Sequence, residues 1–200
     1  MQNQTAWRPT LPETEFDAFI FDCDGTLADT MPLHYRAWCE ALGHHAELFP
    51  VTMFNDLGGV PTCRVVEILN EKHSLSLPVD ALVSHKEALF QTYGAEILPI
   101  DAVVDVARRF HKIKPMAVAS GGHRQIVMST LHTLGIVELF DAIVCSEDYS
   151  RGKPAPDPFL EAARRMGIAP GRCLVFEDSV TGLAAAQAAG MECILVPLER

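Results

Sequence analysis

Basic residues are scarce in this sequence. It holds 16 Lys and Arg against 26 Asp and Glu, which gives a formal net charge of -10. Nucleic-acid backbones and anionic membranes are bound by clustered Lys and Arg, so neither is expected as the main partner. A small anionic substrate remains compatible with this charge, because one or two cations and a metal can bind it locally.

Membrane-spanning runs, secretion signals and paired cysteines are also missing. No apolar run approaches the length of a membrane span, and the N-terminus lacks the charged, apolar and small-residue succession of a signal peptide. We expect a cytoplasmic protein with reduced thiols. The six cysteines show no C-x-x-C spacing, and several lie in apolar runs where Cys acts as a small hydrophobe: Cys23, Cys39, Cys63, Cys145, Cys173 and Cys193.

Most of the sequence alternates between strand-like and helix-like segments. Short apolar runs rich in Val, Ile and Phe, separated by amphipathic helices, predict an α/β fold with a parallel sheet covered on both faces. The first strand is expected near 18–21. After residue 98 the predicted helices are 101–112, 123–134, 157–166 and 179–189, and the predicted strands are 116–119, 142–145, 173–176 and 193–196.

One long interval, 31–93, breaks this alternation. It predicts helices after Pro32, over 63–73 and over 79–93, with no convincing strand, while 44–59 is mixed and receives no assignment. We therefore expect a helical insertion after the first strand. The predicted organisation is a lead-in over 1–15, a core formed by 16–30 and 95–200, and a helical cap over 31–94.

The stretch that ends the first strand carries the first chemical signal. Asp22 and Asp24 follow an apolar run, share one side of an extended chain, and precede Gly25, which lets the backbone turn sharply. Two adjacent carboxylates repel each other unless a cation lies between them or one keeps its proton. This arrangement indicates chemistry more than packing.

Polar residues also follow the later strands. Because ligands bind at the carboxyl ends of parallel strands, we expect these segments to meet Asp22 and Asp24 in one crevice. The segments are Ser120-Gly121-Gly122, the run from Arg151 to Asp157 that contains Lys153, and Glu177-Asp178-Ser179.

This set of residues suits phosphoryl transfer through the protein. Carboxylates bind a hard divalent cation, which we expect to be Mg²⁺. Such an ion lets an anionic nucleophile approach an anionic substrate. Lys153, the Ser120 hydroxyl and the backbone N–H groups around Gly121 could stabilise the phosphate oxygens. One strand-end aspartate could attack phosphorus, while its neighbour handles the proton.

Taken together, these motifs resemble those of the haloacid dehalogenase superfamily, and the resemblance covers nearly the whole chain from Phe19. The helical insertion and the run from His34 to Trp38 are similar to the β-phosphoglucomutase-like branch of sugar-phosphate phosphatases and mutases. The resemblance implies a Rossmann-like three-layer core with a mobile helical cap. The residues that carry it are 22–30, Ser120, 152–157 and 177–179.

The resemblance also assigns roles. It makes Asp22 the nucleophile and Asp24 the general acid and base, with Ser120 and Lys153 holding the transferred phosphate. It places Mg²⁺ between Asp22, the backbone carbonyl of Asp24, Glu177 and Asp178.

In the cap, His34 matches the family's cap histidine, which helps to position the substrate and the general acid. Arg64 and Lys86 are further candidates for binding the substrate's anion, with a solvated surface position as the alternative for both. The expected partner is a small phosphorylated sugar or related metabolite, and the chain is expected to act as a monomer.

Hydrolysis and mutase chemistry share almost all of these residues. Related mutases commonly offer Ser and Asn side chains after the second-strand hydroxyl, where this chain has Gly121, Gly122 and His123. This departure favours a phosphatase, with a β-phosphoglucomutase-type mutase as the alternative. Two alternatives belong to other functional classes. One is a receiver-like phospho-acceptor domain, but such domains are too short to hold the insertion. The other is a catalytically silent binding protein.

Overall fold

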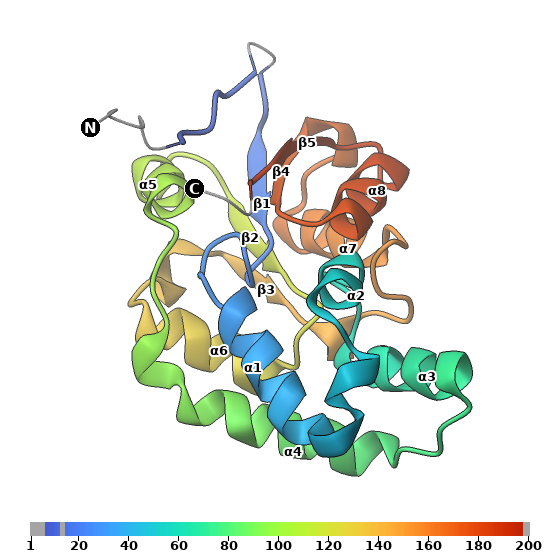
Figure 1. The fold of residues 1–200 in the computed structure, drawn as a ribbon. Coiled ribbons are helices and arrows are strands. Elements are labelled where there is room, and N and C mark those ends of the chain that lie inside the picture. Colours follow the sequence, from blue (N-terminus) through green and yellow to red (C-terminus); the bar gives the residue numbers. More distant parts are fainter. Residues whose placement is uncertain (1–6, 13–14, 198–200) are drawn as a thin grey trace.

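A parallel sheet forms the centre of the molecule (Figure 1). The computed structural model describes residues 7–12 and 15–197, so part of the predicted lead-in lies outside the described residues. Within these ranges the sheet has five strands in the order β3-β2-β1-β4-β5. Their bounds are β1 Ala18–Phe21, β2 Met116–Ala119, β3 Ala142–Val144, β4 Cys173–Glu177 and β5 Glu192–Leu195.

The first strand of the chain lies in the middle of the sheet. Phe19 is in register with Met116 of β2 on one side and with Leu174 of β4 on the other, and all pairings are parallel. The whole of β1 is buried, as are β2 and β4. The carboxyl ends of these three strands therefore meet at one edge, which confirms the predicted α/β parallel sheet.

Helices cover both faces of the sheet. On one face, α5 (Asp101–Phe110) and α6 (Arg124–Thr133) bury Val and Leu side chains against β1 and β4 phenylalanines. On the other, α7 (Asp157–Met166) and α8 (Val180–Ala188) pack small residues and Phe159 against the strands. The result is a three-layer, Rossmann-like core, as predicted.

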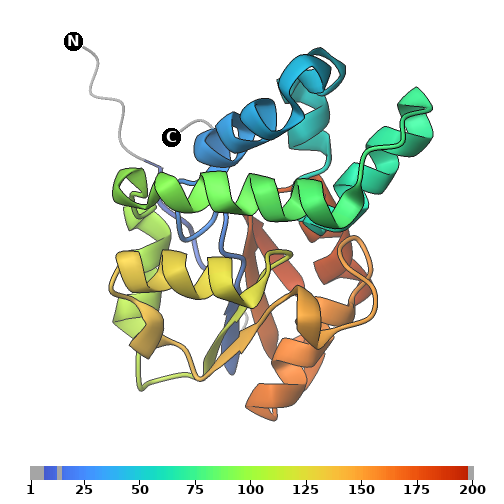
Figure 2. The same ribbon diagram turned by 90° about the horizontal axis from the view of Figure 1, so that it is seen from below.

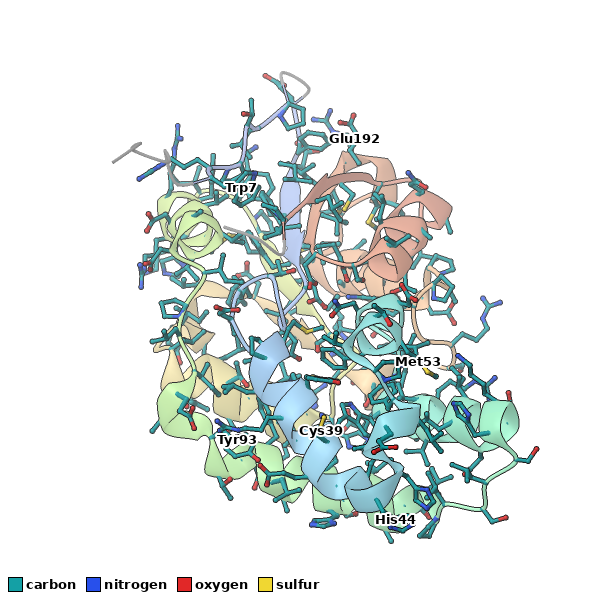
Figure 3. All side chains as sticks on the ribbon, viewed as in Figure 1. Trp7, Cys39, His44, Met53, Tyr93 and Glu192 are labelled. Atoms are coloured by element: carbon teal, nitrogen blue, oxygen red, sulfur yellow. The ribbon has the colours of Figure 1, made fainter. Side chains whose placement is uncertain are left out.

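The insertion after β1 is helical and has a hydrophobic cluster of its own. Trp38, Phe49 and Met53 belong to this cluster, and Figure 3 labels Met53 among the side chains of the insertion. Helix α4 runs alongside α1 (Figure 2). The helices of the insertion are α1 Met31–Leu42, α2 Val51–Asp56, α3 Thr62–His73 and α4 Val79–Thr92.

Several details differ from the sequence prediction. Helix α2 lies in the stretch that received no assignment, after a 3₁₀ segment at Gly43–Leu48. Strand β4 reaches Glu177, because that residue is in register with Leu195 of β5. Helix α8 begins at Val180 because the Ser179 hydroxyl accepts the Gly182 N–H and caps the helix. No helix in the described part of the chain is long and apolar enough to cross a membrane.

Candidate active site

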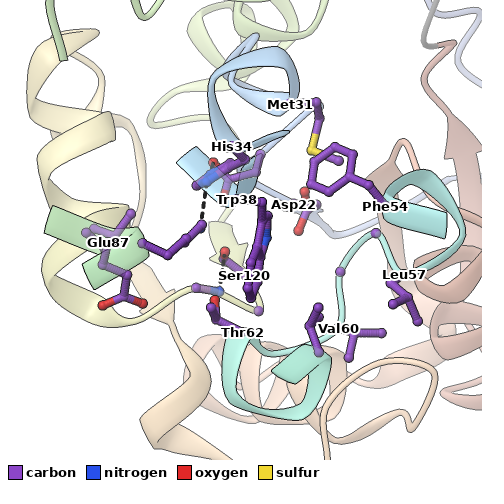
Figure 4. Close-up of a pocket in the computed structure, with 18 of the residues that line it drawn as sticks. Asp22, Met31, His34, Trp38, Phe54, Leu57, Val60, Thr62, Glu87 and Ser120 are labelled. Carbon is purple, nitrogen blue, oxygen red and sulfur yellow. Dashed lines mark hydrogen bonds and ion pairs between the residues drawn. The ribbon is translucent and has the colours of Figure 1, made fainter. Parts of the chain in front are cut away.

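A pocket of about 80 Å³ lies between the helical insertion and the carboxyl ends of the strands (Figure 4). Its floor contains both strand-end aspartates, Asp22 and Asp24, and the turn that follows β2. Its other walls come from α1, α4 and the segment that joins α2 to α3. The predicted site residues that line it are Asp22, Asp24, His34, Lys86, Ser120 and Gly121.

The loop after β1 is fixed by its own backbone. The N–H groups of Leu27 and Ala28 both donate to the Cys23 carbonyl, and the Gly25 N–H donates to the Ala28 carbonyl. Gly25 has a φ of +85°, and a Cβ there would overlap the Asp178 carboxylate. Glycine is thus required both by the turn and by the close approach of a predicted metal ligand.

Three buried carboxylates gather beside this loop. Ligand oxygens of Asp22, Glu177 and Asp178 all lie within 4.8 Å of one another. The Lys153 ammonium lies 2.5 Å from Asp22 Oδ1 and 2.8 Å from Glu177 Oε1, and the Lys153 side chain is fully buried. Three carboxylates against one ammonium leave an excess of negative charge, which is unfavourable away from water.

The pKa values in this cluster reflect that excess. Burial raises the pKa of Asp22 to about 7, although Lys153 partly opposes the shift; the charges of Glu177 and Asp24 raise it further. Burial, together with the charges of Asp22 and Glu177, also raises the pKa of Asp178 well above its ordinary value. A divalent cation would oppose both shifts because it favours the charged carboxylates, so these residues fit a hard oxygen-seeking ion such as Mg²⁺.

Glu177 is held by its neighbours in the next turn. Both the backbone N–H and the hydroxyl of Ser179 donate to Glu177 Oε2, while Lys153 donates to Oε1. Gly182 on α8 lies so close that a Cβ at this position would overlap the Glu177 carboxylate. The absence of a side chain at Gly182 is therefore what lets Glu177 lie in the cluster.

Replacing Gly182 with Ala is expected to weaken Mg²⁺ binding by about tenfold or more, because the new methyl group displaces the carboxylate of Glu177, a predicted ligand. Isothermal titration with Mg²⁺ measures this directly. Gly171→Ala is the control, since a Cβ there would meet only the Gly190 carbonyl at an ordinary 3.7 Å. Equal Mg²⁺ affinity in both variants would show that Glu177 does not bind the ion.

Asp24 is not one of the three clustered carboxylates and takes part in a second network. His34 Nε2 lies 3.0 Å from Asp24 Oδ1, and Lys86 Nζ lies 2.9 Å from His34 Nδ1. The Thr30 hydroxyl donates to the same Asp24 oxygen at 2.7 Å. An ammonium can only donate, so Nδ1 accepts from Lys86 and His34 is neutral with its proton on Nε2.

The pKa values agree with this arrangement. Burial, reinforced by the nearby charge of Lys86, lowers the pKa of His34. Burial lowers the pKa of Lys86 to about 8. Burial alone would raise the pKa of Asp24, but His34, Thr30 and Lys86 more than offset it and lower the pKa to about 2. Asp24 is thus a carboxylate in the structure.

The turn after β2 completes the pocket. The Ser120 hydroxyl is buried and accepts the Gly122 N–H at 3.0 Å. A Cβ on Gly121 would lie 2.6 Å from the Gly59 carbonyl, so the insertion and the core approach each other here at backbone distance. The Thr181 hydroxyl of α8 also donates to the Gly58 carbonyl. The Gly58-Gly59 pair therefore lies against the core.

Arg64 is not brought to the pocket. It lies on α3 with its guanidinium bound to Glu67 and Glu71, and its side chain is 47% exposed. The structure favours the alternative of a solvated surface cation. Lys86 is the opposite case, because it is buried within the pocket wall.

Sequence reasoning missed four features of this pocket. They are the Thr30 contact to Asp24, the Thr26 hydroxyl that donates to Asp178, the Glu87 carboxylate, and an apolar wall of Trp38, Phe49 and Phe54. The two threonines follow the aspartates in the same motif, which was a usable signal. The aromatic residues looked like ordinary core, and they do pack in the insertion's hydrophobic cluster.

Comparison with known proteins agrees with this geometry. Residues 16–190 match the family model for haloacid dehalogenase-like hydrolases. The fructose-1-phosphate phosphatase YqaB of Escherichia coli is 38% identical over 183 residues, covering 92% of this chain and 97% of that protein. A phosphorylated carbohydrates phosphatase of Thermotoga maritima is 30% identical, covering 89% of this chain and 83% of that protein.

A solved structure is also similar. The crystal structure of CbbY from Rhodobacter sphaeroides in complex with phosphate has a TM-score of 0.78 at 28% identity, covering 91% of this chain and 86% of that one. The resemblance seen in the strand-end motifs is thereby confirmed across the fold. The chain belongs to the haloacid dehalogenase-like hydrolases.

Proposed function

We propose that this protein is a Mg²⁺-dependent phosphatase that hydrolyses a small sugar phosphate through an aspartyl-phosphate on Asp22. The observation that carries the proposal is that Asp22 belongs both to the buried carboxylate cluster and to the pocket. A carboxylate in that position can meet a metal-bound phosphate from within the pocket. The phosphatases named among the relatives act on phosphorylated sugars, which supports the substrate class.

In the first half of the reaction, an Asp22 oxygen attacks phosphorus and the bond to the sugar oxygen breaks. Asp24 gives a proton to that leaving oxygen. In the second half, Asp24 takes a proton from water, which attacks the aspartyl-phosphate and releases inorganic phosphate with Asp22 restored. Lys153, Ser120 and the Gly121 N–H would hold the phosphate oxygens, and bound Mg²⁺ would neutralise their charge.

The network around Asp24 suits these two protonation states. The carboxylate form present in the structure is the base that the second half needs. For the first half, His34 can pass its Nε2 proton to Asp24 while Nδ1 takes a proton from Lys86. We propose that Lys86 and His34 supply this proton and that Thr30 orients Asp24.

This role of Lys86 predicts a loss of kcat as pH rises through about 8, where Lys86 loses its proton. Lys86→Arg keeps the charge at alkaline pH but cannot give up a proton, so its kcat should be low and its pH profile should lack the alkaline limb near pH 8. The pKa of Lys86 in the folded protein lies below its ordinary value of 10.5. Between pH 8 and 10.5 the folded state therefore binds fewer protons at Lys86 than the unfolded state does. Deprotonation of Lys86 therefore raises the free energy of unfolding as pH rises. The expected fall in kcat cannot come from unfolding caused by this deprotonation.

Steady-state profiles of both proteins, measured with a phosphate-release assay, test this. Lys86→Met should lower kcat about 10- to 100-fold, within the range usual for proton transfer. If kcat of Lys86→Arg falls with rising pH near pH 8 just as it does in the wild type, the proton-supply role is contradicted.

Hydrolysis and mutase activity are separated by what accepts the phosphoryl group. We favour water, since Gly121 and Gly122 offer no side chains to hold a second phosphate. Incubation with Mg²⁺ and a panel of phosphorylated sugars, followed for phosphate release and for isomer formation, tests this. Isomer formation without phosphate release would overturn the phosphatase proposal in favour of a mutase.

We also propose a role for the insertion, a cellular compartment and an oligomeric state. The insertion, residues 31–94, would act as a cap that opens for the substrate, with the Gly58-Gly59 segment making part of its contact with the core. All six cysteines are free thiols, which supports a place in the reducing cytoplasm. We also propose that the protein works as a monomer.

A further inference from the structure

A carboxylate from the insertion and an imidazole from the core are paired at the edge of the pocket. Glu87 lies on α4, and His123 directly precedes α6. Glu87 Oε1 lies 2.8 Å from His123 Nδ1. The Glu87 side chain is 17% exposed and lines the pocket. Figure 4 shows Glu87 and Asp22 on opposite sides of the Trp38 ring. Neither member of this pair has a place in the reaction described above.

The pocket offers little positive charge at this edge. Its charged lining consists of the carboxylates of Asp22, Asp24 and Glu87 and of the Lys86 ammonium, while the His34 imidazole is neutral. Lys86 already donates to His34. No other Lys or Arg lines the pocket within the described ranges.

The nearby arginines are held elsewhere. Arg124 follows His123 directly, but its guanidinium binds the Asp148 carboxylate and the Ile143 carbonyl. Arg64 on α3 is bound by two glutamates on its own helix. A second phosphate on a substrate would thus meet the Glu87 carboxylate with no free guanidinium beside it.

We infer that Glu87 is a specificity-determining residue that selects substrates carrying a single phosphate. Its charge repels a second phosphate at the end of the pocket away from Asp22. Within the described chain no residue is paired with its second oxygen, Oε2, which can accept hydrogen bonds from hydroxyl groups of the sugar. His123 is a positioning residue that holds Oε1. This inference rests on the proposed phosphatase function and defines its substrate class.

The apolar wall supports the same assignment. Trp38, Phe49 and Phe54 line the pocket and offer ring surfaces instead of anion-binding groups. Such surfaces suit the C–H face of a sugar, while a doubly charged phosphate gains nothing from them. The pocket is therefore built for one anionic end and one neutral end.

The test compares two substrates that share a sugar: fructose 1-phosphate and fructose 1,6-bisphosphate. For the Mg²⁺-loaded wild-type protein, kcat/KM should be at least about 100-fold higher for the monophosphate. Glu87→Gln keeps the shape and removes the charge, so it should raise kcat/KM for the bisphosphate about tenfold, mainly through KM. The kcat/KM for the monophosphate should fall, because a neutral amide oxygen accepts hydrogen bonds from the sugar less strongly than a carboxylate does, so the ratio of the two kcat/KM values is the readout.

Asp80→Asn is the matched control. It removes the same charge from the same helix at an exposed position outside the pocket, so the ratio of the two kcat/KM values should stay at the wild-type level. His123→Ala should raise KM for the monophosphate with little change in kcat. His123→Asn, which can still donate to Glu87, should restore much of the loss.

The outcomes separate the two proposals. p-Nitrophenyl phosphate, which has no sugar, reports phosphatase chemistry alone. If phosphate is released from none of the compounds, the proposed function fails and this inference fails with it. If the protein is active but the wild type accepts both fructose phosphates equally, or Glu87→Gln leaves their ratio unchanged, only the role of Glu87 is overturned.

Discussion

Asp22→Asn is expected to reduce phosphate release from any substrate by about four orders of magnitude or more, the scale seen when a covalent nucleophile is removed. The amide is a poor nucleophile, yet it has nearly the same shape and still fits the buried site between β1 and Lys153. The measurement is kcat for the wild type and the variant in saturating Mg²⁺. Rapid quenching of the wild-type reaction, followed by mass analysis, should recover a phosphate adduct on the peptide that contains Asp22.

Folding and metal binding must be checked separately in this variant. Circular dichroism and Mg²⁺ titration show whether the fold and the site survive, and Asp80→Asn serves as a charge control at an exposed position. A folded, Mg²⁺-binding Asp22→Asn protein that retains wild-type kcat would refute Asp22 as nucleophile. Slow phosphorylation of Asp22 without turnover in the wild type would favour a receiver-like role.

Lys153→Met is expected to lower the free energy of unfolding by about 3–5 kcal/mol in the absence of metal, which is typical when one partner of a buried ion pair is removed. The Lys153 side chain and that of Glu177 are fully buried, and Asp22 is nearly so, leaving the carboxylates no other described cation in contact. Mg²⁺ should restore part of the loss because it neutralises the same oxygens. Activity should be lost with or without Mg²⁺.

Urea unfolding in EDTA and in excess Mg²⁺ measures both effects. Arg151→Met is a fitting control, because Arg151 lies in the same loop but forms a solvent-exposed pair with Asp157, whose loss should change little. Adding Asp22→Asn to Lys153→Met removes one of the stranded charges, so the double variant should be more stable than Lys153→Met alone. Additive effects of the two substitutions would contradict their coupling.

The sheet could be predicted closely from the sequence. Each strand is a short run of apolar residues. A parallel strand that is covered on both faces of the sheet needs such an uninterrupted run, because the side chains on both faces are buried. The predicted range for β2 matches the observed Met116–Ala119, and the others are within one residue at each end. Helix α2 could not be predicted in the same way, since a six-residue helix is too short to display a helical period.

The candidate site was predictable for those residues whose place is determined by the end of a strand. Asp22, Ser120 and Glu177 each end or directly follow a strand, so the parallel sheet brings them to the same edge. The residues of the insertion depend on how helices pack, which no local pattern determines. Arg64 was therefore only a candidate for the substrate's anion, with a solvated surface position as the alternative, and it is exposed and paired with glutamates of α3. Glu87 was overlooked beside Lys86.

The order of the sheet also constrains how the molecule can be made. The central strand β1 is synthesised first, yet its neighbour β4 joins Ala18 to Cys173, near the end of the chain. On the ribosome, Asp22 emerges long before Glu177 and Asp178, with which it forms the buried carboxylate cluster. The helices of 31–94 emerge before β4, and α1 and α3 both pack against α4 within this interval, so the insertion can begin to fold in the meantime. The predicted catalytic cluster therefore cannot be complete until the chain has been synthesised as far as Asp178.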